Sequence, residues 1–83
     1  MAAPDRSERE RHVAAVCGAV AGDDWVALRR VLHPAVRFTD PQRRTTRGRT
    51  KVIAVLRTLD SLDEPDLVEL REGRVGVWTC APE

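Results

Sequence analysis

Asp40 is the residue whose surroundings in the sequence most suggest chemistry. It ends a short segment in which Val36 and Phe38 alternate with polar residues, and Pro41 follows it. Because side chains alternate between the two faces of a strand, the Asp40 carboxylate should continue the apolar face of Val36 and Phe38. Apolar surroundings raise the pKa of a carboxyl group and suit it to act as a general base. The alternative is a strand end at which the aspartate accepts hydrogen bonds from neighbouring backbone amides.

The histidines and cysteines of the chain are isolated from one another. His12 lies near the apolar positions of a predicted helix, where it could line a pocket or the edge of a core. His33 ends a second predicted helix, where the helix dipole favours a cation. Cys17 and Cys80 could form one disulfide, but a reduced cytoplasmic protein is the interpretation that we favour. No group of these residues has the spacing of metal ligands, so we predict no metal and no cofactor.

A local basic cluster follows Asp40, and its members are Arg43, Arg44, Thr45, Thr46, Arg47 and Arg49. It could bind a phosphate or an acidic partner, or it could be a solvated loop, since no aromatic residues or glycine-rich loop accompany it. The whole chain has 14 basic and 13 acidic residues. This balance excludes a chain-wide attraction to nucleic acid or to a membrane surface. No apolar run approaches the ~20 residues that span a bilayer, and the charged first residues do not resemble a secretion signal.

Two amphipathic helices are predicted in the first part of the chain. One covers residues 8–21, and the other runs from Trp25 to about Leu32, so the two should pack as a helical hairpin. Their ends carry the usual signals, namely a capping box at Ser7 and Glu10, a stop at Gly22, an N-cap at Asp23 or Asp24 and a break at His33 and Pro34.

A strand and a third helix follow. The alternating segment 35–40 predicts a strand, and residues 45–47 are a candidate for a second, short one. A broad apolar stripe predicts a helix from Arg49 and Thr50 to about Leu59. A polar connection at 60–65 leads to the last part of the chain.

The C-terminal part is the clearest hairpin. Strands at 67–71 and 74–78 flank Glu72 and Gly73, and a two-residue turn with glycine second is typical of a tight hairpin. The symmetrical register pairs Leu70 with Val75 and Val68 with Val77 on the core face. It leaves Leu67 opposite Trp78 on the outer face, where the pair would form an interface with a second copy.

These elements predict one small α+β domain over residues 1–83. The helical hairpin and the third helix should pack on one face of a curved, mixed or antiparallel sheet. The chain is short enough that folding buries only about 60–65% of the unfolded surface. We expect residues 1–6 to be frayed.

Residues 20–40 read VAGDDWVALRRVLHPAVRFTD, and Pro41 follows. This stretch resembles the nuclear transport factor 2 superfamily, and in particular its SnoaL-like polyketide cyclases and ketosteroid isomerases. Those chains share an Ala-Gly-Asp turn, a Trp- or Leu-bearing second helix and a strand that ends in Asp-Pro. Arg47 to Arg49 resembles the Gly-Arg start of the family's third helix, so the likeness covers about residues 8–59. It implies a cone-shaped fold, shortened by about two strands because family members usually exceed a hundred residues.

The resemblance also implies roles for particular residues. Asp40 falls where the isomerase branch has the aspartate that removes a proton next to a carbonyl group. The tyrosine that stabilises the oxyanion in that family would fall at Ala15, and the chain contains no tyrosine. The family's second oxyanion acid has no equivalent, since Glu69 and Thr79 are the nearest options and neither lies in a matching motif.

We therefore predict a dimeric ligand- or partner-binding module without strong catalytic activity. A pocket for a small lipophilic ligand would be lined by His12, Val16, Trp25, Phe38 and Val55, and a homodimer would form through Leu67 and Trp78. The alternative is an isomerase- or cyclase-type enzyme that uses Asp40 as general base on a lipophilic carbonyl compound. Neither hypothesis involves nucleic acid or a membrane, and both fit a cytoplasmic protein.

Overall fold

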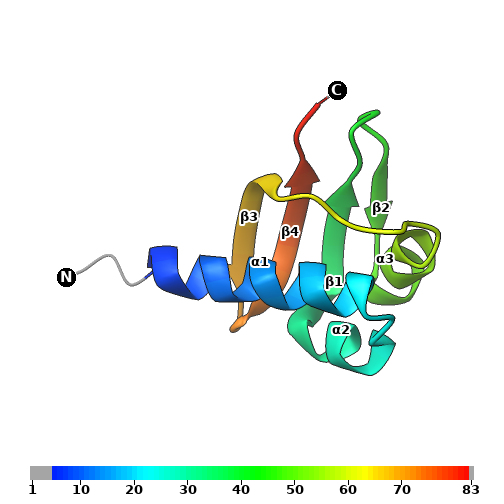
Figure 1. The fold of residues 1–83 in the computed structure, drawn as a ribbon. Helices are drawn as coiled ribbons and strands as arrows, with labels where there is room; N and C mark the ends of the chain where they lie inside the picture. Colours follow the sequence, from blue (N-terminus) through cyan, green and yellow to red (C-terminus); the bar gives the residue numbers. More distant parts are fainter. Residues whose placement is uncertain (1–4, 83) are drawn as a thin grey trace.

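A layer of helices covers one face of a mixed sheet (Figure 1). The computed structural model describes residues 5–82. Within this range the elements are, in order, α1 (Asp5–Ala21), α2 (Trp25–Val31), β1 (Leu32–Thr39), β2 (Thr45–Arg47), α3 (Arg49–Leu56), β3 (Pro65–Arg71) and β4 (Arg74–Cys80). The predicted α+β class is confirmed, including the short strand at 45–47.

The strand order β2-β1-β4-β3 determines which strand ends lie next to each other. β1 pairs with β2 and β3 with β4 in antiparallel fashion, whereas the central pair β1 and β4 is parallel. The C-terminal ends of β1 and β4 therefore lie at the same edge of the sheet, next to Asp40 and Ala81 respectively. The connection from α3 to β3 crosses in front of the sheet (Figure 1).

The core lies between the helices and the inner face of the sheet. Alternate residues of β1, Val36 and Phe38, are buried there with Val75 and Trp78 of β4. The helices contribute mainly aliphatic side chains, namely Val13, Val16, Ala19, Val20, Leu28, Val52 and Leu56. Burial of this apolar surface is the main stabilising contribution to a fold of this size.

The first helix differs from the prediction in where it begins and in which residue closes it. α1 begins at Asp5, so Ser7 lies inside the helix and the predicted capping box at Ser7 is wrong. Of the segment 1–6 that we expected to be frayed, residues 5 and 6 are helical and residues 1–4 lie outside the described range. The helix ends at Ala21 as predicted, but Asp23 rather than Gly22 has the left-handed conformation (φ 54°) that closes it.

The turn from α1 to α2 uses both aspartates. The Asp24 amide donates to the Ala19 carbonyl (2.8 Å) and the Asp23 amide to the Val20 carbonyl (3.3 Å), which satisfies the last carbonyls of α1. Asp24 then caps α2, because its Oδ1 accepts the amide of Ala27 at 3.1 Å. Of the two predicted caps, Asp24 is the one that the structure uses.

β1 begins earlier than predicted, at Leu32. α2 ends at Val31, and His33 and Pro34 belong to the strand instead of ending the helix. The restriction that proline places on the preceding residue favours an extended His33, which is compatible with a strand. The strand ends at Thr39, so Asp40 lies just beyond it.

The third helix, α3, is shorter than predicted, since it ends at Leu56 and tighter turns follow as far as Leu59.

The C-terminal hairpin has the predicted turn but a different register. Glu72 (φ 54°) and Gly73 (φ 78°) are both left-handed, as a two-residue hairpin turn requires. Leu70 pairs with Val75 as predicted, but Gly76 is an additional residue in β4, so Val68 faces Trp78 instead of Val77.

This bulge turns the predicted outer residue inward. A shift of one residue moves each later side chain to the other face of a sheet, and Trp78 is accordingly only 1% exposed. Leu67 lies opposite Thr79 and is 44% exposed. The prediction that Leu67 and Trp78 form an outer patch is therefore wrong.

Candidate functional site

Two hollows lie on either side of the connection between α3 and β3. We call residues 57–64 the crossing segment. The edge pocket, of about 320 Å³, lies where β1, α3 and β4 end, and the helix pocket, of about 440 Å³, lies between the crossing segment and α1. Leu62, Asp63 and Glu64 line both pockets, so the crossing segment is the wall that separates them.

The edge pocket has an apolar wall formed by different elements of the fold. This wall consists of Phe38, Val55, Leu59, Leu62 and Cys80. Phe38 and Cys80 are buried, because the parallel ends of β1 and β4 bring them into the core layer. Burial raises the pKa of the Cys80 thiol, with the neighbouring Trp78 indole acting in the opposite direction. The thiol is therefore protonated at neutral pH and contributes to the apolar wall.

Asp40 lines the same pocket and organises the turn after β1. Its Oδ1 accepts hydrogen bonds from the backbone amides of Gln42 (3.0 Å) and Arg44 (2.8 Å). The Asp40 amide also donates to the Arg44 carbonyl at 2.9 Å. This is the strand-end geometry that we gave as the alternative for this residue. Among the residues that the structure describes, Oδ2 has no hydrogen-bond partner, so one carboxylate oxygen is available at the pocket.

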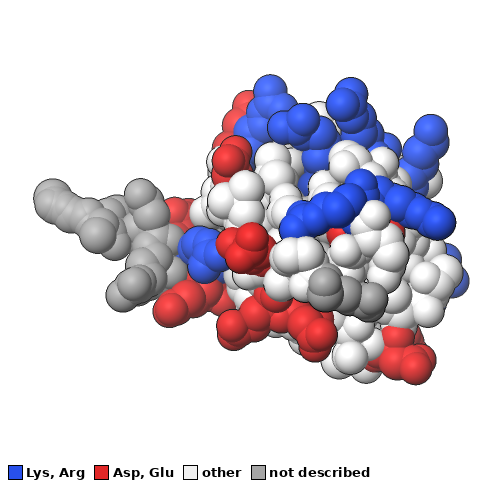
Figure 2. Space-filling model, turned by 90° about the horizontal axis from the view of Figure 1, so that it is seen from above, with Lys and Arg blue, Asp and Glu red and all other residues white. Residues whose placement is uncertain are grey.

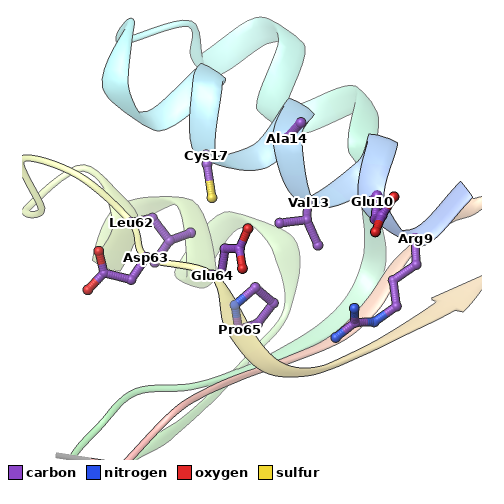
Figure 3. Close-up of a pocket in the computed structure, with 9 residues that line it drawn as sticks. All are labelled: Arg9, Glu10, Val13, Ala14, Cys17, Leu62, Asp63, Glu64 and Pro65. Atoms are coloured by element: carbon purple, nitrogen blue, oxygen red, sulfur yellow. The ribbon is translucent and has the colours of Figure 1, made fainter. Parts of the chain in front are cut away.

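Four charged residues, Arg9, Glu10, Asp63 and Glu64, line the helix pocket together with apolar ones (Figure 3). Cys17 and Leu62 point into it, and the carboxylate of Glu64 lies between them and Val13, whereas Asp63 points away. Burial raises the pKa of Cys17, and the nearby carboxylates of Glu64 and Asp63 raise it further. Cys17 is therefore a neutral thiol at physiological pH, which makes it a weak nucleophile.

The structure brings only some of the predicted site residues together. Phe38, Val55 and Asp40 line the edge pocket, as a shared site requires. Val16 is 1% exposed and belongs to the core, not to a pocket wall. Trp25 lies on α2 beneath the guanidinium of Arg57, whose central carbon is 5.7 Å from the ring centroid.

His12 lies near the far turn of the hairpin and lines neither pocket. Its Nδ1 is 2.7 Å from the carbonyl oxygen of Glu8, and its Nε2 is 2.8 Å from that of Gly73. Both neighbours are acceptors, so each contact requires the histidine nitrogen to donate. His12 thus fastens the hairpin turn to α1.

Sequence reasoning missed Leu62 and Cys80 as pocket residues. Leu62 is the one leucine in the polar connection 60–65 that we predicted, and its isolation was a usable signal. No sequence signal marked Cys80 as a pocket residue, because its position depends on the parallel pairing of β4 with β1.

The described residues show neither a candidate metal site nor a helix that could span a membrane. The described side chains, those of residues 8–82, include no group of three or more His, Cys, Asp or Glu placed to bind a metal ion. Within residues 5–82, every helix is too short or too polar to cross a membrane.

The fold resembles that of several solved structures, although no family model and no curated protein matches the chain. A candidate ketosteroid isomerase from Kribbella flavida has a TM-score of 0.72 at 17% identity, with 88% of this chain and 76% of that chain covered. An LEH-like epoxide hydrolase from M. tuberculosis has a TM-score of 0.68 at 15% identity, with coverages of 88% and 80%. An NTF-2-like protein of unknown function from Burkholderia xenovorans has a TM-score of 0.65 at 16% identity, with coverages of 99% and 89%.

These similarities confirm the predicted fold, that of nuclear transport factor 2-like proteins. Two of these neighbours are described by different activities, and the third is of unknown function. Since fold does not determine function, the residues of the pocket have to carry any functional argument.

Proposed function

We propose that the protein is a binding module, without strong catalytic activity, for a small lipophilic molecule that carries a hydrogen-bond donor. The observation that carries this proposal is the edge pocket, which combines an apolar wall with polar residues, among them Asp40 with its free Oδ2. Ligand pockets are mostly apolar, with a few polar groups that fix orientation, and about 300 Å³ is the lower end of their size range. A small bicyclic alcohol has the matching chemistry.

The fixed state of Asp40 favours binding over catalysis. Its other oxygen is engaged by two backbone amides, which hold the carboxylate in one orientation. General-base catalysis next to a carbonyl also needs a donor that stabilises the developing oxyanion, usually the largest contribution. The chain contains no tyrosine, and the Thr58 hydroxyl already donates to the Val55 carbonyl at 2.6 Å, which leaves only the exposed side chains of Ser61 and Gln42 as neutral donors in the pocket lining.

An isomerase- or cyclase-type activity is the second candidate. It is favoured by the position of Asp40 beside Phe38 at the pocket, where the carboxylate could reach a bound carbonyl compound. One of the fold neighbours is a candidate ketosteroid isomerase, which supports this candidate only by analogy.

Binding can be tested with 2-decalol and its ketone, 2-decalone, by following backbone amide signals in NMR titrations. We expect shifts around Phe38, Val55 and Leu62, and tighter binding of the alcohol because it can donate to Asp40. Ala81→Phe fills the edge pocket from an exposed position and should abolish the shifts. Ala14→Phe, the same change at an exposed position of the helix pocket, should leave them intact. Equal effects of the two variants would contradict the assignment.

Catalysis can be tested by the exchange of protons next to the carbonyl of 2-decalone in D₂O. A binding module should leave the exchange rate unchanged, and Asp40→Asn should behave like the natural protein. Acceleration by the natural protein that Asp40→Asn removes would establish the isomerase-type alternative instead.

The homodimer remains a proposal, but the interface that we predicted through Leu67 and Trp78 can no longer include Trp78. Trp78 is buried, so an interface on the outer sheet face would rest on Leu67 among charged neighbours. Sedimentation velocity at tens of micromolar tests it, with Leu67→Glu as the variant that should lower the mass of any dimer formed there.

A further inference from the structure

The outer face of the sheet, turned away from α1, is strongly basic. It presents four exposed arginines, Arg37 of β1, Arg47 of β2, Arg71 of β3 and Arg74 of β4. Glu69 is the carboxylate that the strand register places on this face, and exposed Asp66 is an unpaired residue of β3 next to Leu67. Figure 2 shows that Lys and Arg gather along one border of the molecule, whereas Asp and Glu gather mainly along the border on the α1 side. The chain carries a net charge of only +1, so basic and acidic residues are nearly equal in number but gather on different sides of the molecule.

The arginines of this face are arranged against one another. Arg37 lies directly opposite Arg47 in the β1–β2 ladder, and Arg71 lies opposite Arg74 in the β3–β4 ladder. Like charges in directly opposed positions destabilise a sheet. Among the side chains of residues 8–82 the only ion pair is that of His33 with Glu72, so none of the four arginines has a carboxylate of these residues within ion-pair distance. Glu72, in the turn between β3 and β4, interacts with the charges of Arg71 and Arg74 beyond ion-pair distance, so the fold offsets the positive charge of this face only in part.

A hollow of about 300 Å³ lies in this face between two of the arginines. Arg37 and Arg71 line it from β1 and β3, and Gly76 and Val77 of β4 lie between them. Gly76 leaves the space open, since a Cβ added there would lie 2.9 Å from the Cβ of Arg71. The bulge that turns Trp78 inward thus also leaves a recess flanked by two guanidinium groups.

We propose that the outer face docks an acidic, extended protein segment, and that one carboxylate of the segment occupies the hollow between Arg37 and Arg71. Guanidinium groups bind carboxylates through charge-assisted hydrogen bonds, which supplies the recognition. Exposed Leu67 and the half-buried Val77 offer apolar contacts to the side chains between the carboxylates.

Other occupants fit this face less well. Single-stranded nucleic acid usually stacks its bases on aromatic residues, but Phe38 and Trp78 are buried and Trp25 lies on α2. Glu69, at the rim of the hollow, would also repel a continuous phosphate backbone. A second copy that used the same face would place four arginines against four arginines, because a two-fold interface is self-complementary, so we favour the acidic segment over the homodimer through Leu67.

The test uses a fluorescein-labelled peptide of alternating Glu and Thr, ten residues long, and measures its anisotropy with the full chain at low salt. We expect Arg37→Gln with Arg71→Gln to weaken binding about tenfold, about threefold for each exposed pair removed. Arg11→Gln with Arg30→Gln makes the same change in net charge on exposed helical positions and should have little effect. Equal losses in the two double variants would overturn the proposal, as would no binding of the peptide.

A gain of affinity provides a second arm. Glu69→Gln removes the only carboxylate at the hollow and should tighten binding about threefold. The matched change Glu10→Gln, on α1, should not tighten binding.

Tighter binding of a labelled (dT)₁₀ than of the peptide would assign the face to nucleic acid. A doubled mass in sedimentation without peptide, lost in the Arg37 and Arg71 variant, would assign it to a second copy, and either outcome overturns the proposal.

Discussion

At the scale of single residues, Asp40 has a structural role that can be separated from any role in binding. Its Oδ1 accepts two backbone amides in the turn after β1. Asp40→Ala leaves both amides without this partner and should cost about 1–2 kcal/mol of unfolding free energy. Asp40→Asn keeps an oxygen acceptor at the same place and should cost less than half as much. Urea denaturation of the two variants measures this difference, and equal costs would mean that the turn does not depend on the accepted bonds.

Glu72 should make the stability depend on pH in the acid range. Nε2 of His33 donates to Oε1 of Glu72 at 2.8 Å, and this hydrogen bond, with the charges of Arg71 and Arg74, lowers the pKa of Glu72 from its ordinary 4.5. The unfolded chain binds the proton more readily, so the contribution is present above pH 4.5 and is lost as the pH falls through the lowered folded value. The urea midpoint of the natural protein should exceed that of Glu72→Gln at about pH 6, and the difference should shrink steadily as the pH falls below 4.5. A constant difference would contradict the linkage.

At the scale of the elements, the turn between α1 and α2 contains a strained position. Asp23 closes α1 in the left-handed conformation, with φ 54°, which L-residues adopt at a cost. Asp23→Gly should stabilise the fold by about 0.5–1 kcal/mol, since glycine takes this conformation without strain. Gly73→Ala, at φ 78° in the hairpin turn, is the opposite change and should destabilise by a similar amount. Thermal unfolding of both variants tests the pair, and a destabilised Asp23→Gly would show that the aspartate side chain matters more than its backbone.

The same elements show what the sequence could and could not reveal. The helices, the short strand and the hairpin turn follow from apolar periodicity and local signals, and the structure contains all of them. The register after the turn did not follow, because Val77 and Trp78 are both apolar and either could face the core. Only the fit of Trp78 between sheet and helices, with Gly76 as the additional residue, selects between the two. Long-range packing therefore determines the register of the hairpin, and no local sequence pattern contains that information.

The candidate site, like the fold, could be predicted from the sequence only in part. Asp40, Phe38 and Val55 share a pocket because strand parity and the helix stripe place them on the inner side. His12 and Trp25 carry comparable signals in sequence, yet they are used to fasten the hairpin turn and to contact Arg57. The difference lies in which elements meet at the open sheet edge, and the strand order fixes that only in three dimensions.

At the scale of the whole molecule, the segregation of charge should govern behaviour that net charge does not. The chain has a net charge of +1 and a pI of about 7.9, yet the outer sheet face concentrates four arginines. A cation-exchange matrix contacts one side of a protein at a time, so at pH 7 retention should follow the basic face. Arg37→Gln with Arg71→Gln should elute at clearly lower salt than the natural protein. Arg11→Gln with Arg30→Gln should elute close to it, although both variants lose two charges. Identical elution of the two variants would mean that the matrix senses net charge alone and that the arginines do not act as one patch.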